Sequence, residues 1–220
     1  METVEQAQQT IYRELTTNDA EVRAEFLKHF ESKALAFCEA MSQAFLAWRT
    51  LDAMLQQDEK RGPVSQFVYA AVTLHILSFK LLLSGQTVAA GNLLRQVVET
   101  IALALLCSGK DLDILTRFMK DQYSTQKAVR DVLRHWQALG LKQDGVQALQ
   151  GAEKFYHHYS HITRLTLGTM LSFSENVLYV GASFDDGKID AYRKEVEGRV
   201  SLADAFPNFV AAVVANLKKW

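Results

Sequence analysis

The sequence contains few residues that break or cross-link a chain: two prolines, eleven glycines and two cysteines among 220 residues. Proline and glycine interrupt helices, so their scarcity favours long helices over many short strands. The two cysteines, Cys38 and Cys107, are too few for a disulfide framework. We therefore expect an α-helical protein with free thiols, located in a reducing compartment.

A strong net charge is also missing, because 24 basic and 25 acidic side chains leave a formal charge of −1. No bulk field therefore attracts nucleic acid or an anionic membrane, and nucleic-acid binding would need a local patch. Residues 1–9 are polar and acidic, which predicts no secretory signal. The two most apolar stretches, 64–83 and 88–107, approach the length of a membrane span, but both contain ionisable residues that lipid disfavours. We expect a cytoplasmic protein with no membrane partner.

Apolar side chains recur at three- and four-residue steps, which is the period of an amphipathic helix. This pattern predicts helices over 3–16, 19–55, 63–84, 87–107, 111–139, 144–172 and 201–219. The fold class is therefore all-α, a multi-helix up-and-down bundle formed by a single domain over residues 1–220.

We expect the core of this domain to lie at about 19–172 and residues 173–220 to be a C-terminal extension. Within the extension, 177–180 is β-prone and 185–187 is a turn signal. The segment 173–189 is therefore predicted to be a short hairpin or an irregular ordered loop before the C-terminal helix. Pro207 is expected to kink or restart that helix.

Polar side chains on the apolar helices indicate a first candidate site. Asn92, Arg95 and Glu99 follow one another at steps of three and four, so they share one stripe of an otherwise apolar helix. Arg95 and Glu99 can pair, but buried charges need further partners. We predict a polar group with the following members: His75, Asn92, Arg95, Glu99, Tyr156 and Tyr159. This group is either a structural network that fixes helix register or a pocket between helices.

Histidines one helical turn apart indicate a second candidate site. Glu153, His157 and His161 are spaced four and four, and two imidazoles with a carboxylate suit a divalent cation such as zinc. A solvated helix face explains the same spacing. We therefore expect no resident cofactor, with a divalent metal as the alternative.

Two segments resemble a group of bacterial helical proteins that are loosely similar to the HEPN superfamily. These segments are Leu93-Leu-Arg-Gln-Val-Val-Glu-Thr100 and Phe155-Tyr-His-His-Tyr-Ser-His-Ile-Thr-Arg164. The group has an Arg-x-x-x-Glu pair on a central helix and a later helix rich in Tyr and Ser that carries His. Arg164 stands where that helix is expected to have histidine. The resemblance implies a helical bundle and a homodimer.

HEPN ribonucleases use an Arg-x4–6-His motif, and the segment Arg130-Asp-Val-Leu-Arg-His135 fits its letters. The resemblance therefore implies catalytic candidates in two places: His157, His161 and Arg164, or Arg130 with His135. Since no complete catalytic motif is present, our leading hypothesis is a cytoplasmic, homodimeric binding or regulatory protein of uncertain enzymatic status. A metal-independent ribonuclease, with nucleic acid as its partner, and a metal-binding bundle are the alternatives.

Overall fold

The computed structural model describes residues 3–220, and these residues form an all-α fold with nine α-helices and no extended strand. Short 3-10 turns join some of the helices. The helices are α1 (Val4–Thr16), α2 (Ala20–Leu55), α3 (Gly62–Leu83), α4 (Thr87–Ser108), α5 (Ile114–Met119), α6 (Ala128–His135), α7 (Gln143–His157), α8 (Arg164–Thr169) and α9 (Ile189–Leu217).

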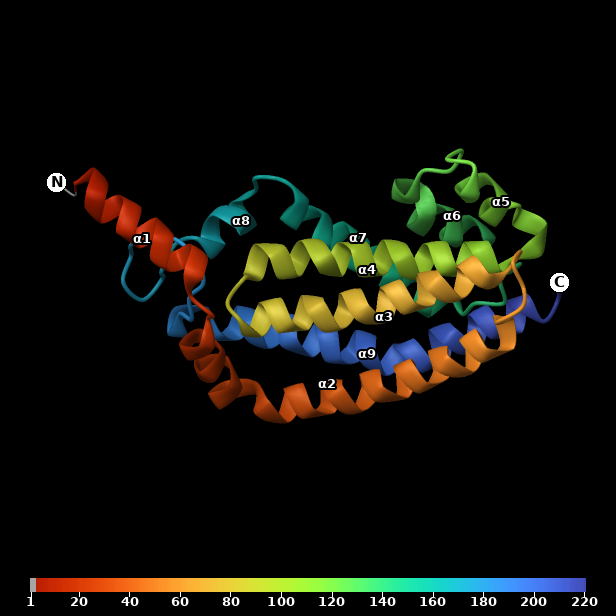
Figure 1. Cartoon of the computed structure of the whole chain (residues 1–220), viewed down its shortest axis with the longest axis horizontal. Helices are drawn as coiled ribbons and strands as arrows, with labels where there is room; N and C mark the ends of the chain where they lie inside the picture. Colours follow the sequence, from red (N-terminus) through yellow and green to blue (C-terminus); the bar gives the residue numbers. More distant parts are fainter. Residues whose placement is uncertain (1–2) are drawn as a thin grey trace.

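Four long helices, α2, α3, α4 and α9, lie alongside one another and form the bundle (Figure 1). Each contributes an apolar stripe to one continuous core, as the three- and four-residue spacing predicts. Proline in the first turn of α3 is compatible with a helix start, because that position needs no hydrogen-bonding N–H. The all-α, up-and-down bundle predicted from the sequence is confirmed.

The turn between α3 and α4 requires glycine. Gly85 has φ +76°, and a Cβ atom there would lie 2.8 Å from the side chain of Val22 and 2.9 Å from the backbone of Ser183. A left-handed backbone and this lack of space both exclude larger residues. The turn brings α4 back antiparallel to α3, and α6 and α7 cover another side of α4. As a result α4 is the most enclosed helix of the bundle.

Two predicted helices are wrong in extent. The expected helix 111–139 is divided into α5 and α6, and the expected helix 144–172 ends at His157. After that point His161 is extended, and the Thr163 side chain caps a new short helix by accepting a hydrogen bond from the backbone N–H of Thr166. Threonine side chains that bond the local backbone compete with helix continuation, which the apolar period does not reveal.

The C-terminal helix is longer and more central than predicted. α9 begins at Ile189, twelve residues before the expected start, and continues through Pro207. Its residues Val196, Phe206 and Val213 are fully buried, so the core is not confined to residues 19–172. The residues after 172 are therefore part of the bundle rather than an extension of it.

The segment before α9 is an ordered loop rather than a hairpin. One isolated antiparallel bridge joins Leu171 and Leu178. The buried carboxylate of Asp185 accepts hydrogen bonds from the backbone N–H groups of Phe173, at 2.6 Å, and Ser174, at 3.3 Å. The ammonium group of Lys188 donates to the carbonyl oxygen of Thr169 at 3.1 Å. These polar contacts fix the loop without a strand ladder.

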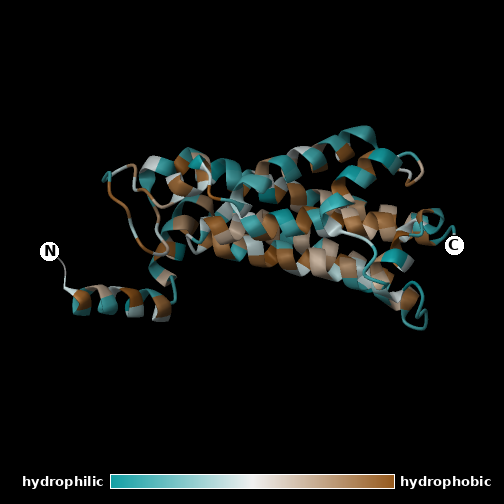
Figure 2. Ribbon diagram, turned by 90° about the horizontal axis from the view of Figure 1, so that it is seen from above, coloured by the Kyte–Doolittle hydropathy of each residue, from teal (hydrophilic) through white to brown (hydrophobic). Residues whose placement is uncertain are grey.

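Three helical segments are long and apolar enough to cross a membrane by length and composition: Gly62–Leu83, Thr87–Ser108 and Asp186–Leu217. In this fold the same segments supply much of the bundle interior, and α4 is the most buried of them. Figure 2 shows that hydrophobic and hydrophilic residues alternate around the helices of the bundle.

Candidate functional site

A network of polar side chains lies inside the bundle and is centred on Arg199 of α9. The Arg199 side chain is fully buried, and its Nη1 donates to Glu195 Oε2 at 2.5 Å, one turn earlier on the same helix. Its Nε donates to the hydroxyl of Ser78 on α3 at 3.2 Å. The ring Nε2 of His75 lies 3.0 Å from the carbonyl oxygen of Arg199. These contacts join α3 to α9.

Two tyrosines connect the same network to the segment that covers α4. The hydroxyl groups of Tyr156 and Tyr159 donate to the two carboxylate oxygens of Glu195, at 3.2 and 3.0 Å. Burial, followed by the nearby negative charge of Glu195, raises the pKa of Tyr159 above its usual range, and burial also raises the pKa of Tyr156. Both tyrosines are therefore neutral hydrogen-bond donors at physiological pH.

Glycine on α4 allows Tyr159 to approach this closely. A Cβ atom at Gly91 would lie 2.3 Å from the Cγ atom of the Tyr159 ring. Such a distance is far inside van der Waals contact, so only glycine permits the ring to lie against the helix backbone. The position of the tyrosine pair thus depends on one residue of α4.

A second group lies at the edge of the network. Arg95 Nε donates to Glu99 Oε1 at 2.9 Å, one turn along α4, and both side chains are mostly buried, each 17% exposed. Arg95 Nη1 donates to the hydroxyl of Ser160 at 2.7 Å, next to Tyr159 in the chain. The predicted Arg95–Glu99 pair therefore exists and anchors the turn that follows α7.

The structure brings together most of the predicted polar group, but as a packed network. His75, Tyr156 and Tyr159 meet around Glu195 and Arg199, while Arg95 and Glu99 meet Ser160. Asn92 is half-buried on α4 and is not among the hydrogen-bonded members of either group within residues 3–220.

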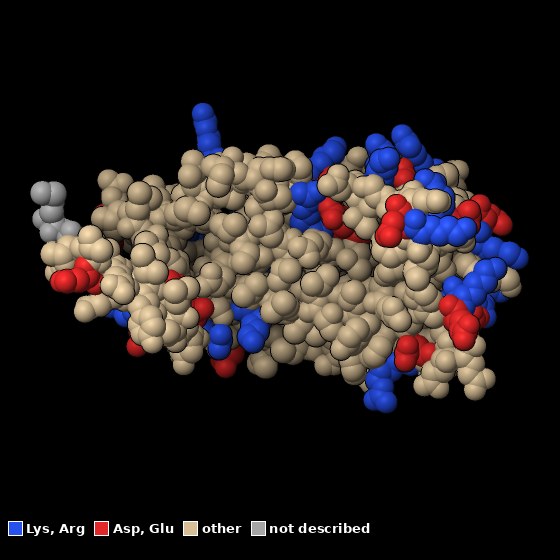
Figure 3. All heavy atoms as spheres, turned by 45° about the horizontal axis from the view of Figure 1, so that its top comes forward, with Lys and Arg blue, Asp and Glu red and all other residues tan. Residues whose placement is uncertain are grey.

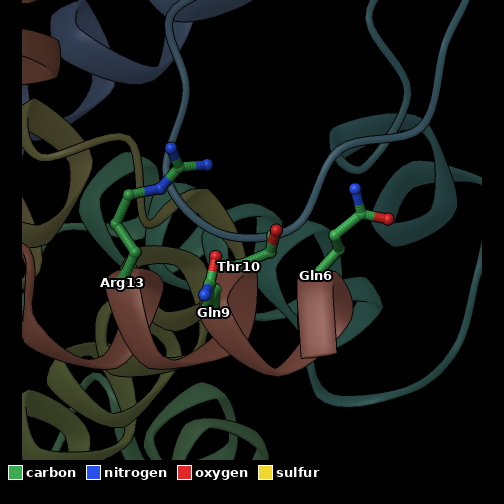
Figure 4. A pocket seen from close by; sticks show the side chains of 4 residues that line it. All are labelled: Gln6, Gln9, Thr10 and Arg13. Atoms are coloured by element: carbon green, nitrogen blue, oxygen red, sulfur yellow. The ribbon is translucent and has the colours of Figure 1, made fainter. Parts of the chain in front are cut away.

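Two surface hollows lie elsewhere. One is lined by Gln6, Gln9, Thr10 and Arg13 of α1 (Figure 4), and the other lies between α2 and α9. Neither is lined by a member of the polar network. Of the two interpretations of the predicted polar group, these observations favour the structural network.

Glu195 and Arg199 are the two central residues that sequence reasoning did not identify. A signal was present, because Glu and Arg four residues apart repeat, in reverse order, the spacing of Arg95 and Glu99. The predicted C-terminal helix began at residue 201, so neither residue was assigned to a helix. A helix drawn from 189 would have placed Arg199 on the apolar stripe between Val196 and Ala203.

His75 lies deepest of the histidines. Its side chain is fully buried between the rings of Phe37, at 5.0 Å, and Phe206, at 5.4 Å between ring centroids. Desolvation by burial lowers the pKa of His75 to about 3. The imidazole is therefore neutral at physiological pH, where it donates from Nε2 to the carbonyl of Arg199.

The predicted metal and catalytic histidines lie at the C-terminal end of α7 and just beyond it. His157 and His161 are exposed, and their ring centroids are 4.7 Å apart. Glu153 is half-buried one turn earlier on α7, and Arg164 is exposed at the start of α8. In the part of the chain from residue 3 onward, no three His, Cys, Asp or Glu side chains are arranged to hold a metal ion. The two histidines therefore lie close together as predicted, but Glu153 is not positioned as a third metal ligand.

The other predicted catalytic pair, Arg130 and His135, lies exposed on α6. Arg130 Nε is 3.6 Å from the carboxylate of Asp131, which also receives the hydroxyl of Tyr123 at 3.0 Å. Figure 3 shows basic and acidic side chains intermixed over the end of the molecule that contains α5 and α6. Charge at this surface is therefore partly neutralised by neighbouring carboxylates.

Comparison with known proteins assigns no family. No family model, curated protein or solved structure matches the chain.

Proposed function

We propose that this chain is a non-catalytic helical binding or regulatory protein that acts as a homodimer in the bacterial cytoplasm. The observation that carries the proposal is the use of interior polar groups as partners for one another. Glu195 accepts hydrogen bonds from Tyr156, Tyr159 and Arg199, so the buried ion pair is made within the protein, while Arg199 Nη2 has no hydrogen-bond partner among residues 3–220.

A network of this kind holds helices in a fixed register. A partner would then bind at the surface of the protein. Exposed apolar side chains occur there on α1, α2, α3 and the segment around α8. Exposed apolar side chains that gather into a surface patch are typical of proteins that bind a partner.

Light scattering coupled to size exclusion tests the homodimer directly. We expect the protein at micromolar concentration to elute with twice the mass of the chain. A monomer over the whole concentration range contradicts this part of the proposal.

A metal-independent ribonuclease is the second candidate, and the proximity of His157 and His161 favours it. Two exposed imidazoles 4.7 Å apart, centroid to centroid, are suitably placed for one to accept a proton from a ribose hydroxyl and the other to protonate the leaving oxygen. Arg164 would hold the phosphate, and Arg130 with His135 forms the alternative pair.

Cleavage of a fluorogenic RNA distinguishes this candidate from the binding protein. If the ribonuclease proposal is correct, His161→Ala abolishes cleavage and His135→Ala does not, or the reverse for the alternative pair. Absence of cleavage by the wild-type protein, or cleavage that survives both changes, removes the candidate.

A divalent metal held by Glu153, His157 and His161 is the remaining candidate. The ring distance of the two histidines supports it, and the carboxylate of Glu153 would have to move towards them to complete the site. Elemental analysis of protein purified without a histidine tag tests it. Bound zinc that is lost in His157→Ala supports the site, whereas metal-free protein with no thermal shift on adding zinc refutes it.

A further inference from the structure

Exposed apolar side chains are concentrated at one end of the molecule. Among residues 3–220, 21 large hydrophobic side chains are exposed, and twelve of them come from residues 4–15 and 162–180. We call these twelve the apolar end: Val4, Ile11, Tyr12, Leu15, Ile162, Leu165, Leu167, Met170, Phe173, Val177, Leu178 and Val180. α1 and α8 lie at the same end of the bundle (Figure 1).

Helix α1 presents its apolar side away from its own chain. None of its residues is buried, and Figure 2 shows that it projects from the body of the molecule. Its polar residues Gln6, Gln9, Thr10 and Arg13 line the hollow beside the loop that precedes α9 (Figure 4). The Glu14 carboxylate accepts a hydrogen bond from the backbone N–H of Ala182 at 3.2 Å.

The apolar stripe of α1 lies on a different side of the helix from these polar contacts. Val4, Ile11 and Leu15 recur at steps of seven and four, so they share one face, and they are 85%, 54% and 78% exposed. A helix of 13 residues gains little stability in isolation and normally depends on packing of its apolar face. Among the residues that the structure describes, nothing covers this apolar face of α1.

The amount of apolar surface is sufficient for a stable dimer. Twelve large hydrophobic side chains, each 37–85% exposed, together present apolar area on the order of the roughly 800 Å² that an interface of standard size buries on each partner. The largest apolar patch of a typical monomer is about 300–600 Å². Summed over α1 and residues 162–180, the exposed apolar area of the apolar end is larger than such a single patch.

The charges around the apolar end do not fit an anionic membrane. Residues 3–18 contain one arginine and two glutamates, a net charge of −1, and residues 162–188 contain two basic and three acidic side chains, again −1. Amphipathic helices that bind anionic lipid have Lys and Arg on their polar face, whereas that of α1 is mainly Gln and Thr with Arg13.

We infer that the apolar end is the interface with a second copy of this chain. In a two-fold arrangement, α1 of each protomer lies on the 162–180 surface of its partner, so each copy covers both apolar parts of the other. The projecting helix of one protomer then packs against the apolar surface of the other. This inference rests on the proposed homodimer and specifies which surface forms it.

Charge substitutions on the two sides of α1 test the interface in the full-length protein. Ile11→Glu and Leu178→Glu place a carboxylate within the proposed interface, and Gln9→Glu places the same charge on the polar side of α1. We expect the wild type and Gln9→Glu to be dimers by light scattering. The first two variants should dissociate with a Kd raised by at least about tenfold.

The three variants should share the far-ultraviolet circular dichroism of the wild type, because each changed side chain is exposed in the protomer. A wild-type dimer that tolerates both Ile11→Glu and Leu178→Glu overturns the interface but leaves the homodimer intact. A wild-type monomer overturns both. A monomer that instead cosediments with phosphatidylcholine vesicles identifies lipid as the occupant.

Cross-linking tests the exchange of α1 between protomers. Protein carrying Ile11→Cys is mixed with protein carrying Leu178→Cys, both with Cys38→Ser because Cys38 is exposed. A disulfide-linked heterodimer on oxidation supports α1 lying on the partner's 162–180 surface. Products that contain only one of the two variants overturn this arrangement.

Discussion

At the scale of single residues, the positions at which substitution should be most damaging are those with close packing or buried charge. Gly91 and Glu195 are the clearest cases. Gly91 provides the space that the Tyr159 ring occupies, and Glu195 accepts the hydroxyl group of the same residue. Loss of either should release the segment that covers α4.

Gly91→Ala should destabilise the protein, because the added methyl group would overlap the Tyr159 ring. Overpacking of this kind costs about 1–3 kcal/mol of unfolding free energy, measurable by urea denaturation. Gly151→Ala on α7 is the matched control, since a Cβ atom there meets nothing within 4 Å. This control should gain about 0.5–1 kcal/mol from helix propensity, and equal effects at the two positions would contradict the packing argument.

Glu195→Ala should be more costly, because it leaves the fully buried guanidinium of Arg199 without its carboxylate partner. Breaking a buried ion pair from one side typically costs about 3–5 kcal/mol. Glu197→Ala, two residues away at an exposed position, should change stability by less than about 0.5 kcal/mol. A similar small effect for Glu195→Ala would mean that the network is dispensable.

At the scale of helices, sequence patterns predicted elements that are long and bounded by strong breakers. The predicted helices 19–55, 63–84 and 87–107 agree closely with α2, α3 and α4, since apolar stripes run their full length and Gly85 separates the last two. The apolar period predicts two helices between 111 and 172, but the structure has four, α5 to α8. The period does not reveal the local hydrogen bonds that divide this region.

In the candidate site, too, some contacts could be predicted from the sequence and others could not. The pair Arg95 and Glu99 was predictable, because four-residue spacing on one helix brings two side chains together without knowledge of the fold. The meeting of His75 with Arg199 was not, because these residues are 124 positions apart and touch only through the packing of α3 on α9. Spacing within an element therefore predicts pairs, whereas a network needs the tertiary structure.

Thr163→Ala tests how the short helix α8 is defined. The Thr163 hydroxyl accepts a hydrogen bond from the Thr166 backbone N–H, so its loss should destabilise α8 by about 1 kcal/mol. Hydrogen exchange of residues 164–169 should accelerate while the long helices remain protected. Thr163→Ser keeps the capping oxygen and should exchange nearly as slowly as the wild type.

At the scale of the whole molecule, the buried polar groups make stability depend on pH. His75 is enclosed by the core, where Arg199 is the charged group beside it, and burial lowers its pKa from 6.5 to about 3. The unfolded chain therefore binds a proton at pH values where the native state does not. By linkage, the stability contributed by neutral His75 is complete above pH 6.5 and is lost as pH falls towards 3.

Urea denaturation at pH 7 and pH 5 measures this contribution. The lowered pKa of His75 predicts that the free energy of unfolding falls by about 2 kcal/mol from pH 7 to pH 5, since each pH unit below 6.5 costs about 1.4 kcal/mol. The lowered pKa values of Asp58 and Asp185 affect stability only below the usual aspartate pKa of 3.8, so they do not change stability between pH 5 and pH 7. His75→Gln has no titratable group at this position, so its stability should be nearly the same at both pH values, although lower at pH 7. A pH dependence that persists unchanged in His75→Gln would place the sensitivity elsewhere and would show that His75 is not held neutral by the packing of α3 against α9.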